Sequence, residues 1–107
     1  MSEQVNVVDV DTILDWIEQG KAVVVDVREE NEWQAHHIAG AHLRPLSSFD
    51  AAALPALAPG QKLVLHCRSG VRCGRATAKL LEAGYQGEIN RMAGGINAWI
   101  AAGYPVE

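Results

Sequence analysis

The chain has 107 residues, of which 49% are hydrophobic and 21% charged, and its formal net charge is −4. These proportions are typical of a globular domain and exclude a disordered chain, and the acidic balance argues against a nucleic-acid-binding surface. We expect one domain over residues 1–107 and no membrane association, because no apolar run approaches the ~20 residues of a membrane span. No basic residue precedes Lys21, so a secretory signal is not expected and the prediction is a cytoplasmic protein.

The first two predicted elements are a helix and a buried strand. Apolar residues three or four positions apart predict a helix that Asp9 or Asp11 caps and Gly20 ends. The run 22–26 that follows is rich in β-branched residues and apolar on consecutive positions. This pattern predicts a strand buried on both faces, as in a parallel sheet.

The next part of the chain carries weaker signals. A helical turn is expected over 29–35 and a brief strand over 40–43, which ends before Pro45. We also expect a helix over 49–54 with Ser48 as its cap.

The second half of the chain repeats the alternation of strand and helix. A second buried strand is predicted over 62–67, a loop over 68–72, a helix over 73–83, a weak strand over 88–90 and a last helix over 96–102. Strands that alternate with helices predict an α/β fold with a parallel sheet and helices on both faces. Ligands of such sheets bind at the carboxyl ends of the strands.

Cys67 stands at the carboxyl end of the second buried strand. The segment 67–73, Cys-Arg-Ser-Gly-Val-Arg-Cys, can curl so that its N–H groups form an anion-binding nest, to which the next helix adds the positive end of its dipole. Gly70 removes a Cβ where the backbone must turn tightly. These features favour the thiolate, which is the nucleophilic form. The alternative is that Cys67 is a small buried hydrophobic residue.

Basic residues gather beside this cysteine. Four of the nine Lys and Arg residues follow it closely: Arg68, Arg72, Arg75 and Lys79. In an acidic chain this concentration favours binding of a small anion, and the alternative is a solvated helix face. Two cysteines in a cytoplasmic chain also favour chemistry over a disulfide scaffold.

Four stretches of the chain, taken together and in order, resemble the rhodanese family of single-domain sulfurtransferases. They are 25–29 with the pair Glu32-Trp33, then 37–41, 67–72 and 92–99. The resemblance extends over most of the chain. It implies a rhodanese-like α/β fold with a central parallel sheet of about five strands.

The same resemblance implies a thiosulfate sulfurtransferase. Cys67 would attack the outer sulfur of thiosulfate or a related anion and hold it as a persulfide, from which cyanide, a thiol or a protein acceptor takes it. The loop would bind this sulfur and the donor through Arg68, Ser69, Gly70, Val71, Arg72 and Cys73. This chemistry needs no metal and no organic cofactor, and the spacing of the His and Cys residues does not match a metal motif.

The chain departs from the family pattern at Cys73, where Ser is frequent. Cys73 could resolve an oxidised or persulfidated Cys67 by forming a disulfide, or it could replace Ser passively, and the sequence gives no distance that decides between them. His37 is expected to be a structural hydrogen-bonding residue near the site. Strand alternation is expected to point His66 away from the face used by Cys67.

Other residues near these motifs are interpreted as structural. Asp26 and Arg28 are expected to be a buried carboxylate and an arginine that fix the junction of strand and loop rather than catalytic residues. Trp33 and Trp99 are expected to belong to the core or to a pocket wall. The Gly94-Gly95 pair is expected to let one backbone segment pass close to the loop that carries Cys67.

Two other classes of function compete with sulfur transfer. A cysteine phosphatase or arsenate reductase would use a Cys-x5-Arg loop, but the sixth residue after Cys67 is Cys73 and Arg72 comes one position early. A loop of this length suits a small sulfur species better than a phosphoryl group. The other class is a non-catalytic module that binds a partner, which the presence of Cys67 in a full loop disfavours.

Overall fold

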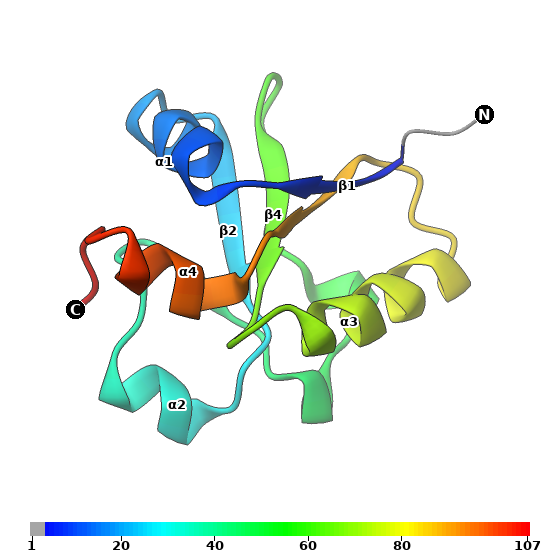
Figure 1. The fold of residues 1–107 in the computed structure, drawn as a ribbon. Helices are drawn as coiled ribbons and strands as arrows, with labels where there is room; N and C mark the ends of the chain where they lie inside the picture. The colour runs from blue at the N-terminus through cyan, green and yellow to red at the C-terminus, as the bar shows by residue number, and fades with distance from the viewer. Residues whose placement is uncertain (1–3) are drawn as a thin grey trace.

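The computed structural model describes residues 4–107, which form a five-stranded parallel sheet and four α-helices (Figure 1). In chain order the elements are β1 (Val5–Val8), α1 (Val10–Glu18), β2 (Ala22–Asp26), α2 (Glu30–Ala35), β3 (His42–Leu43), the 3-10 turns η1 (Leu46–Ser48) and η2 (Ala51–Ala53), β4 (Lys62–His66), α3 (Val71–Glu82), β5 (Ile89–Met92) and α4 (Gly95–Ala101). None of the helices within this range is long and apolar enough to cross a membrane.

The sheet has the strand order β1-β5-β4-β2-β3, and every pairing is parallel. β4 therefore lies at the centre, with Val64 paired to Val24 of β2 and to Asn90 of β5. Because parallel strands all end at one edge of the sheet, residues that follow β2, β4 and β5 meet there. Cys67 is the first residue after β4, so the central strand delivers it to this edge.

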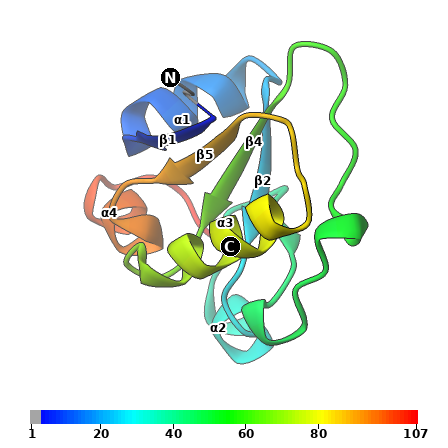
Figure 2. The same ribbon diagram turned by 90° about the vertical axis from the view of Figure 1, so that its right-hand side faces the viewer.

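Side chains of the central strands alternate between two apolar layers, one on each face of the sheet. The layer beneath α3 contains Val25, Leu63, Leu65, Cys73, Ala76 and Leu80. The layer beneath α1 and α4 contains Ile13, Val24, Val64, Ile96 and Trp99. The two views agree that α3 covers one face and that α1 and α4 cover the other (Figures 1 and 2). The short helix α2 lies beyond the carboxyl end of β2, beside the edge where the loops meet (Figure 1).

The α/β fold and most of the predicted elements are confirmed. Asp9 caps the first helix by accepting a hydrogen bond from the N–H of Thr12 at 2.8 Å. The prediction of a helix over 49–54 is wrong, because two 3-10 turns stand in this region with extended backbone at Phe49 between them. Phe49 packs against the core from this extended conformation. The cap of the second turn is Asp50 rather than Ser48.

The start of one helix and the presence of one strand also differ from the predictions. The helix predicted over 73–83 begins at Val71, which shortens the loop after Cys67. Strand β1 was not predicted: it has only four residues, and it lies at the edge of the sheet with Val7 67% exposed, so it lacks the apolar run of a buried strand.

The start of α4 lies directly against the segment that carries Cys67. Gly95 has a φ of +60°, and a Cβ on it would stand 2.5 Å from the carbonyl oxygen of Cys67. The next two N–H groups, of Ile96 and Asn97, donate hydrogen bonds to the carbonyls of Cys67 and Arg68 at 2.8 and 3.1 Å. The expected close passage of a glycine backbone is confirmed, and its contact is with the peptide group of Cys67.

We expect Gly95→Ala to destabilise the fold strongly, because the new Cβ both overlaps this carbonyl and forces a non-glycine residue into the left-handed region. Gly103→Ala is the matched control: its φ is +82°, but a Cβ there meets nothing within 4 Å. Backbone strain should lower the free energy of unfolding of the control by only roughly 1–2 kcal/mol. Gly95→Ala should lower it by roughly 3 kcal/mol or more. Equal losses of unfolding free energy in the two variants, measured by urea unfolding, would contradict the close approach of Gly95 to the Cys67 carbonyl.

Candidate active site

Cys67 is the first residue of the short loop that connects β4 to α3. Gly70 is the N-cap of α3 and has a φ of +116°, a conformation that favours glycine. Its N–H donates a hydrogen bond to Cys67 Sγ at 3.0 Å. The N–H groups of Arg72 and Cys73, in the first turn of α3, add to the lowering of the pKa of this thiol. The predicted nest is therefore present, and Cys67 Sγ takes the place of the side-chain cap that Gly70 cannot provide.

This environment stabilises the thiolate of Cys67. The thiol of Cys73 is the strongest contributor, and the backbone N–H groups of Cys73, Gly70 and Arg72 add to it, so the pKa of Cys67 falls to about 5 although burial opposes the shift. A free cysteine has a pKa of roughly 8.5. At neutral pH Cys67 is consequently a thiolate, although its side chain is only 1% exposed.

Cys73 acts as a hydrogen-bond donor to this thiolate. It is fully buried in the first turn of α3, and both cysteines are free. Its bond to Cys67 and its burial raise the pKa of Cys73 well above its usual range. In the resting site Cys73 is therefore a protonated thiol, in the position where a Ser hydroxyl could make the same contact.

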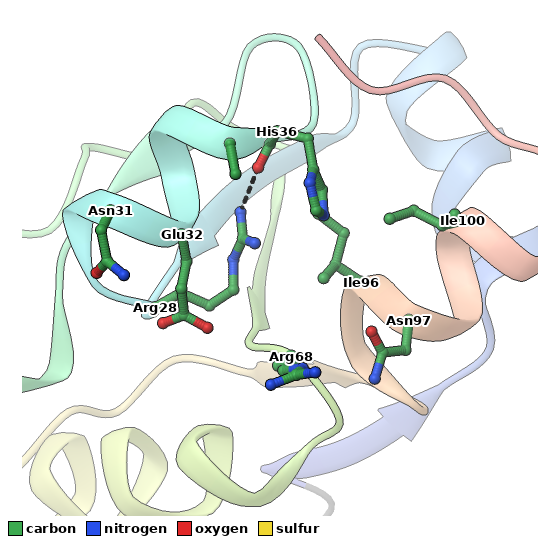
Figure 3. Close-up of a pocket in the computed structure, with 9 residues that line it drawn as sticks. Arg28, Asn31, Glu32, His36, Arg68, Ile96, Asn97 and Ile100 are labelled. Atoms are coloured by element: carbon green, nitrogen blue, oxygen red, sulfur yellow. Dashed lines mark hydrogen bonds between the residues drawn. The ribbon is translucent and has the colours of Figure 1, made fainter.

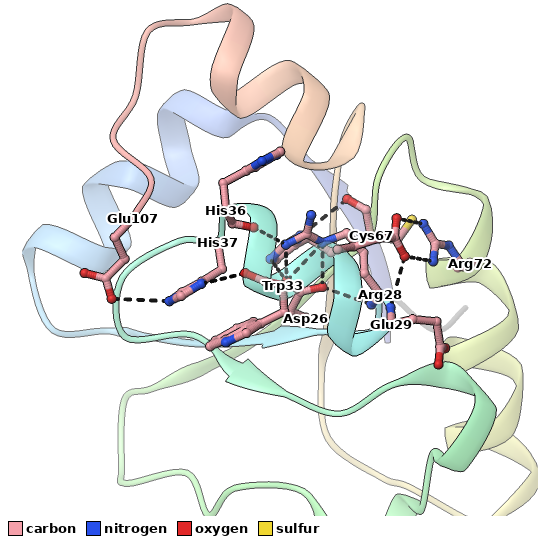
Figure 4. Close-up of polar contacts among 11 residues, drawn as sticks. Asp26, Arg28, Glu29, Trp33, His36, His37, Cys67, Arg72 and Glu107 are labelled. Carbon is pink, nitrogen blue, oxygen red and sulfur yellow. Dashed lines mark hydrogen bonds and ion pairs between the residues drawn. The ribbon is translucent and has the colours of Figure 1, made fainter.

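The guanidinium of Arg72 is held by a carboxylate from α2. Its two terminal nitrogens donate to Glu32 at 2.6 and 2.8 Å, a bidentate geometry that fixes both side chains. This bond lowers the pKa of Glu32 to about 2. Glu32 also accepts from the N–H of Glu29 at 3.0 Å and so closes the capping box of α2. Figure 4 shows the Arg72 guanidinium close to Cys67. Glu32 was not predicted to belong to the site, because forty positions separate it from Arg72 in the chain.

A buried ion pair fastens α2 to the sheet. Arg28 is 2% exposed, and its guanidinium donates to Asp26 Oδ2 at 2.7 Å and to the carbonyl of His36 at 2.8 Å (Figure 4). Asp26 lies at the end of β2, and His36 is the C-cap of α2. Asp26 and Arg28 are both buried, and their ion pair together with the bond to His36 links the end of α2 to the end of β2.

The histidines contribute to the frame of the site. His37 stacks on Trp33 with 3.8 Å between ring centroids, and its Nδ1–H donates a hydrogen bond to the Trp33 carbonyl over 2.9 Å. His66 is fully buried with Nε2 3.6 Å from Asp26 Oδ2, and burial lowers its pKa. His37 thus makes the expected hydrogen bond, and His66 is packed in the interior. Within residues 4–107, no group of three or more His, Cys, Asp or Glu side chains is arranged to hold a metal ion.

A pocket of about 350 Å³ opens between α2 and α4 (Figure 3). It is lined by Arg28, Asn31, Glu32, Ala35, His36, Arg68, Ile96, Asn97 and Ile100. Arg68, the residue after the nucleophile, joins the pocket to the Cys67 loop. Among the other predicted donor-binding residues, Ser69, Gly70 and Val71 line a different recess of about 380 Å³ on the far side of the loop. Val71 is 71% exposed there.

These features define a class of protein: a parallel α/β domain that presents an activated cysteine at the carboxyl end of its central strand. The family of rhodanese-like domains matches residues 9–102. The chain therefore belongs to the rhodanese-like family, and its fold is the one that the four sequence stretches implied.

Several known proteins resemble the chain. An uncharacterized protein of Synechocystis sp., slr1261, is 41% identical over 105 residues, which are 97% of this chain and 58% of that protein. The crystal structure of a rhodanese-related protein from Thermoplasma volcanium superposes with a TM-score of 0.80 at 28% identity, covering 95% of this chain and 97% of the other. Thiosulfate sulfurtransferase from Pseudomonas aeruginosa also superposes with a TM-score of 0.80, at 29% identity, covering 95% of this chain and 19% of that protein. The chain thus spans only part of two of these proteins.

Replacing Cys73 tests its hydrogen bond to the thiolate. Cys73→Ala removes the strongest donor, so we expect the pKa of Cys67 to rise from about 5 by about one to two units, the equivalent of one hydrogen bond to a charged group. Cys73→Ser keeps a donor and should stay near the wild type. The measurement is the rate of alkylation by iodoacetamide against pH, because the rate rises as pH passes the pKa and the thiol becomes thiolate. Identical midpoints for the Ala and Ser variants would show that the contact is without effect.

Proposed function

We propose that this protein is a sulfurtransferase that moves the outer sulfur of thiosulfate, or of a related anion, to a thiophilic acceptor through a persulfide on Cys67. The observation that carries the proposal is a thiolate with a pKa of about 5 inside a loop of inward N–H groups at a helix N-terminus. Such a loop suits a nucleophile that must stay ionised and an anionic sulfur that must be held. Family membership supports the same chemistry.

The proposed reaction has two balanced steps. The Cys67 thiolate attacks the outer sulfur of thiosulfate, the sulfur–sulfur bond of the donor breaks, and sulfite leaves with its electron pair. Cys67 then carries a persulfide anion. A thiol or cyanide next attacks the outer persulfide sulfur, which returns the electron pair to Cys67 Sγ and regenerates the thiolate. Neither step needs a metal, an oxidant or an organic cofactor.

The persulfide keeps a negative charge, which the loop is built to stabilise. The N–H groups of Gly70, Arg72 and Cys73 already point to Sγ in the resting site. A second sulfur on Cys67 would meet the same positive end of the helix dipole. Reduced cysteines and this anion-binding loop suit the reducing environment of the cytoplasm, where we propose the protein works.

The two arginines of the loop are proposed to act differently on the donor. Arg72 contributes mainly through its N–H, because Glu32 compensates its guanidinium charge. Arg68 is exposed, and within residues 4–107 no ion pair engages its guanidinium. Arg68 is therefore the cation that attracts thiosulfate. The same Arg72–Glu32 pair disfavours phosphatase chemistry, which needs a loop arginine free to bind a phosphoryl group.

The first test is the intact mass of the reduced protein after incubation with thiosulfate. We expect a gain of one sulfur atom that cyanide removes, and no gain in Cys67→Ser. The conservative variant should keep the wild-type melting temperature within a few degrees, which circular dichroism checks. Sulfur loading that persists in a folded Cys67→Ser protein would exclude the proposed mechanism.

A second test separates the charge of Arg68 from charge in general. Arg68→Ala should raise the KM for thiosulfate about fivefold, the effect of roughly 1 kcal/mol between unit charges near a protein surface. Arg75→Ala removes an equally exposed cation outside the loop and is the matched control. The effect should shrink as salt rises from about 10 to about 300 mM, because screening weakens exposed charges. Equal KM values for the two variants at low salt would remove Arg68 from donor capture.

A further inference from the structure

The pocket between α2 and α4 carries a prediction about the sulfur acceptor. We propose that this pocket binds a small thiol that bears a carboxylate, and that Arg68 pairs with that carboxylate while the thiol reaches the Cys67 persulfide. The inference rests on the proposed function and names the acceptor class that the same site selects.

Charge pairing leaves the pocket with one uncompensated guanidinium. Of the three charged side chains that line it, Arg28 is paired with Asp26, and Glu32 is paired with Arg72. Arg68 is the lining guanidinium that no ion pair engages in the part of the chain that the structure describes. A ligand with a single negative charge therefore complements this pocket better than a neutral or cationic one.

The rest of the lining matches the body of a small organic thiol. Ile96, Ala35 and Ile100, which is 41% exposed, offer an aliphatic wall, while Asn31 and Asn97 offer amide donors and acceptors (Figure 3). About 350 Å³ is at the small end of the volumes that ligand sites occupy. Such a volume suits a compact metabolite rather than a folded segment of a partner protein.

The pocket is joined to the nucleophile through the backbone. Ile96 and Asn97 line the pocket with their side chains, and their N–H groups hold the carbonyls of Cys67 and Arg68. Arg68, the residue proposed to hold the carboxylate of the thiol, directly follows Cys67 in the chain. In the transfer step the acceptor sulfur forms a bond to the outer persulfide sulfur, the bond from that sulfur to Cys67 Sγ breaks, and Sγ leaves as the thiolate. The acceptor's proton moves to the transferred group or to water, so charge and electrons balance.

The test isolates this second step. Protein loaded with thiosulfate and freed of excess donor is mixed at pH 8, where histidine is ordinarily neutral, with 3-mercaptopropionate, 2-mercaptoethanol or cysteamine. These thiols are similar in size and carry an anionic, a neutral and a cationic end. The loss of the extra sulfur is followed by intact mass over time. The ratio of variant to wild-type rate is compared for each thiol, so that the intrinsic reactivity of the thiols cancels.

Two variants and one control define the expected pattern. Arg68→Gln should slow transfer to 3-mercaptopropionate about fivefold and change transfer to 2-mercaptoethanol less than about twofold. Asn97→Asp places a carboxylate in the pocket without altering the backbone N–H, so it should slow the anionic thiol and accelerate cysteamine by similar factors. Arg75→Gln, an exposed cation outside the pocket, should leave all three ratios near unity.

The outcomes separate this inference from the proposed function. Ratios that do not depend on thiol charge, in protein that loads one sulfur normally, would overturn the pocket assignment and leave the persulfide mechanism standing. Slowing of all three thiols to the same extent by Arg68→Gln would likewise overturn it, because it would mean that Arg68 acts on the persulfide. Failure of the wild-type protein to load sulfur would instead refute the proposed function, and the inference with it.

Discussion

The site depends on one backbone contact, between the start of α4 and the peptide groups of Cys67 and Arg68. Two N–H groups of α4 bind these carbonyls, and they can do so because Gly95 has no Cβ to stand in the way. The contact holds in place the two residues that directly follow β4. Only the four residues 67–70 separate β4 from α3, and they turn so that the N–H of Gly70 bonds Sγ. The anion-binding character of the loop therefore follows from where α4 begins.

Two of the arginines around this loop are compensated by carboxylates. Asp26 and Arg28 neutralise each other in the interior, and Glu32 neutralises Arg72 at the rim. Burial of an unpaired charge is costly, and the carboxylates allow these two arginines to lie beside the sheet. An arginine held in such a pair is not free to bind another anion. The largest contributions to the stability of the thiolate come from dipoles, namely a thiol and three N–H groups. The charge of Arg72 also interacts favourably with the thiolate. Arg68 is exposed, and no ion pair engages it within residues 4–107.

The sequence predicted those parts of this arrangement that depend on residues close together in the chain. Three features act within a few residues and could therefore be recognised in the sequence. They are the β-branched run of β2, the apolar run before Cys67 and the glycines of the two loops. It could not reveal that Glu32 binds Arg72, because nothing local marks a pair that the tertiary fold brings together. The same holds for the role of Cys73, which needed the true start of α3 at Val71. The helix predicted over 49–54 fails because core packing of Phe49 outweighs a modest local propensity.

The burial of the nucleophile links its reactivity to the folded state. Cys67 and Cys73 belong to the same apolar cluster as Leu63, Leu65 and Leu80. Any opening that frees Cys67 from α3 also disrupts this cluster, and the cysteine then returns to the ordinary pKa of roughly 8.5. An unfolded or partly folded chain is consequently protonated at this position at neutral pH and reacts slowly with electrophiles and oxidants. The fold thus confines the reactive thiolate to molecules that are already assembled to use it, and it spares the nascent or denatured chain from modification.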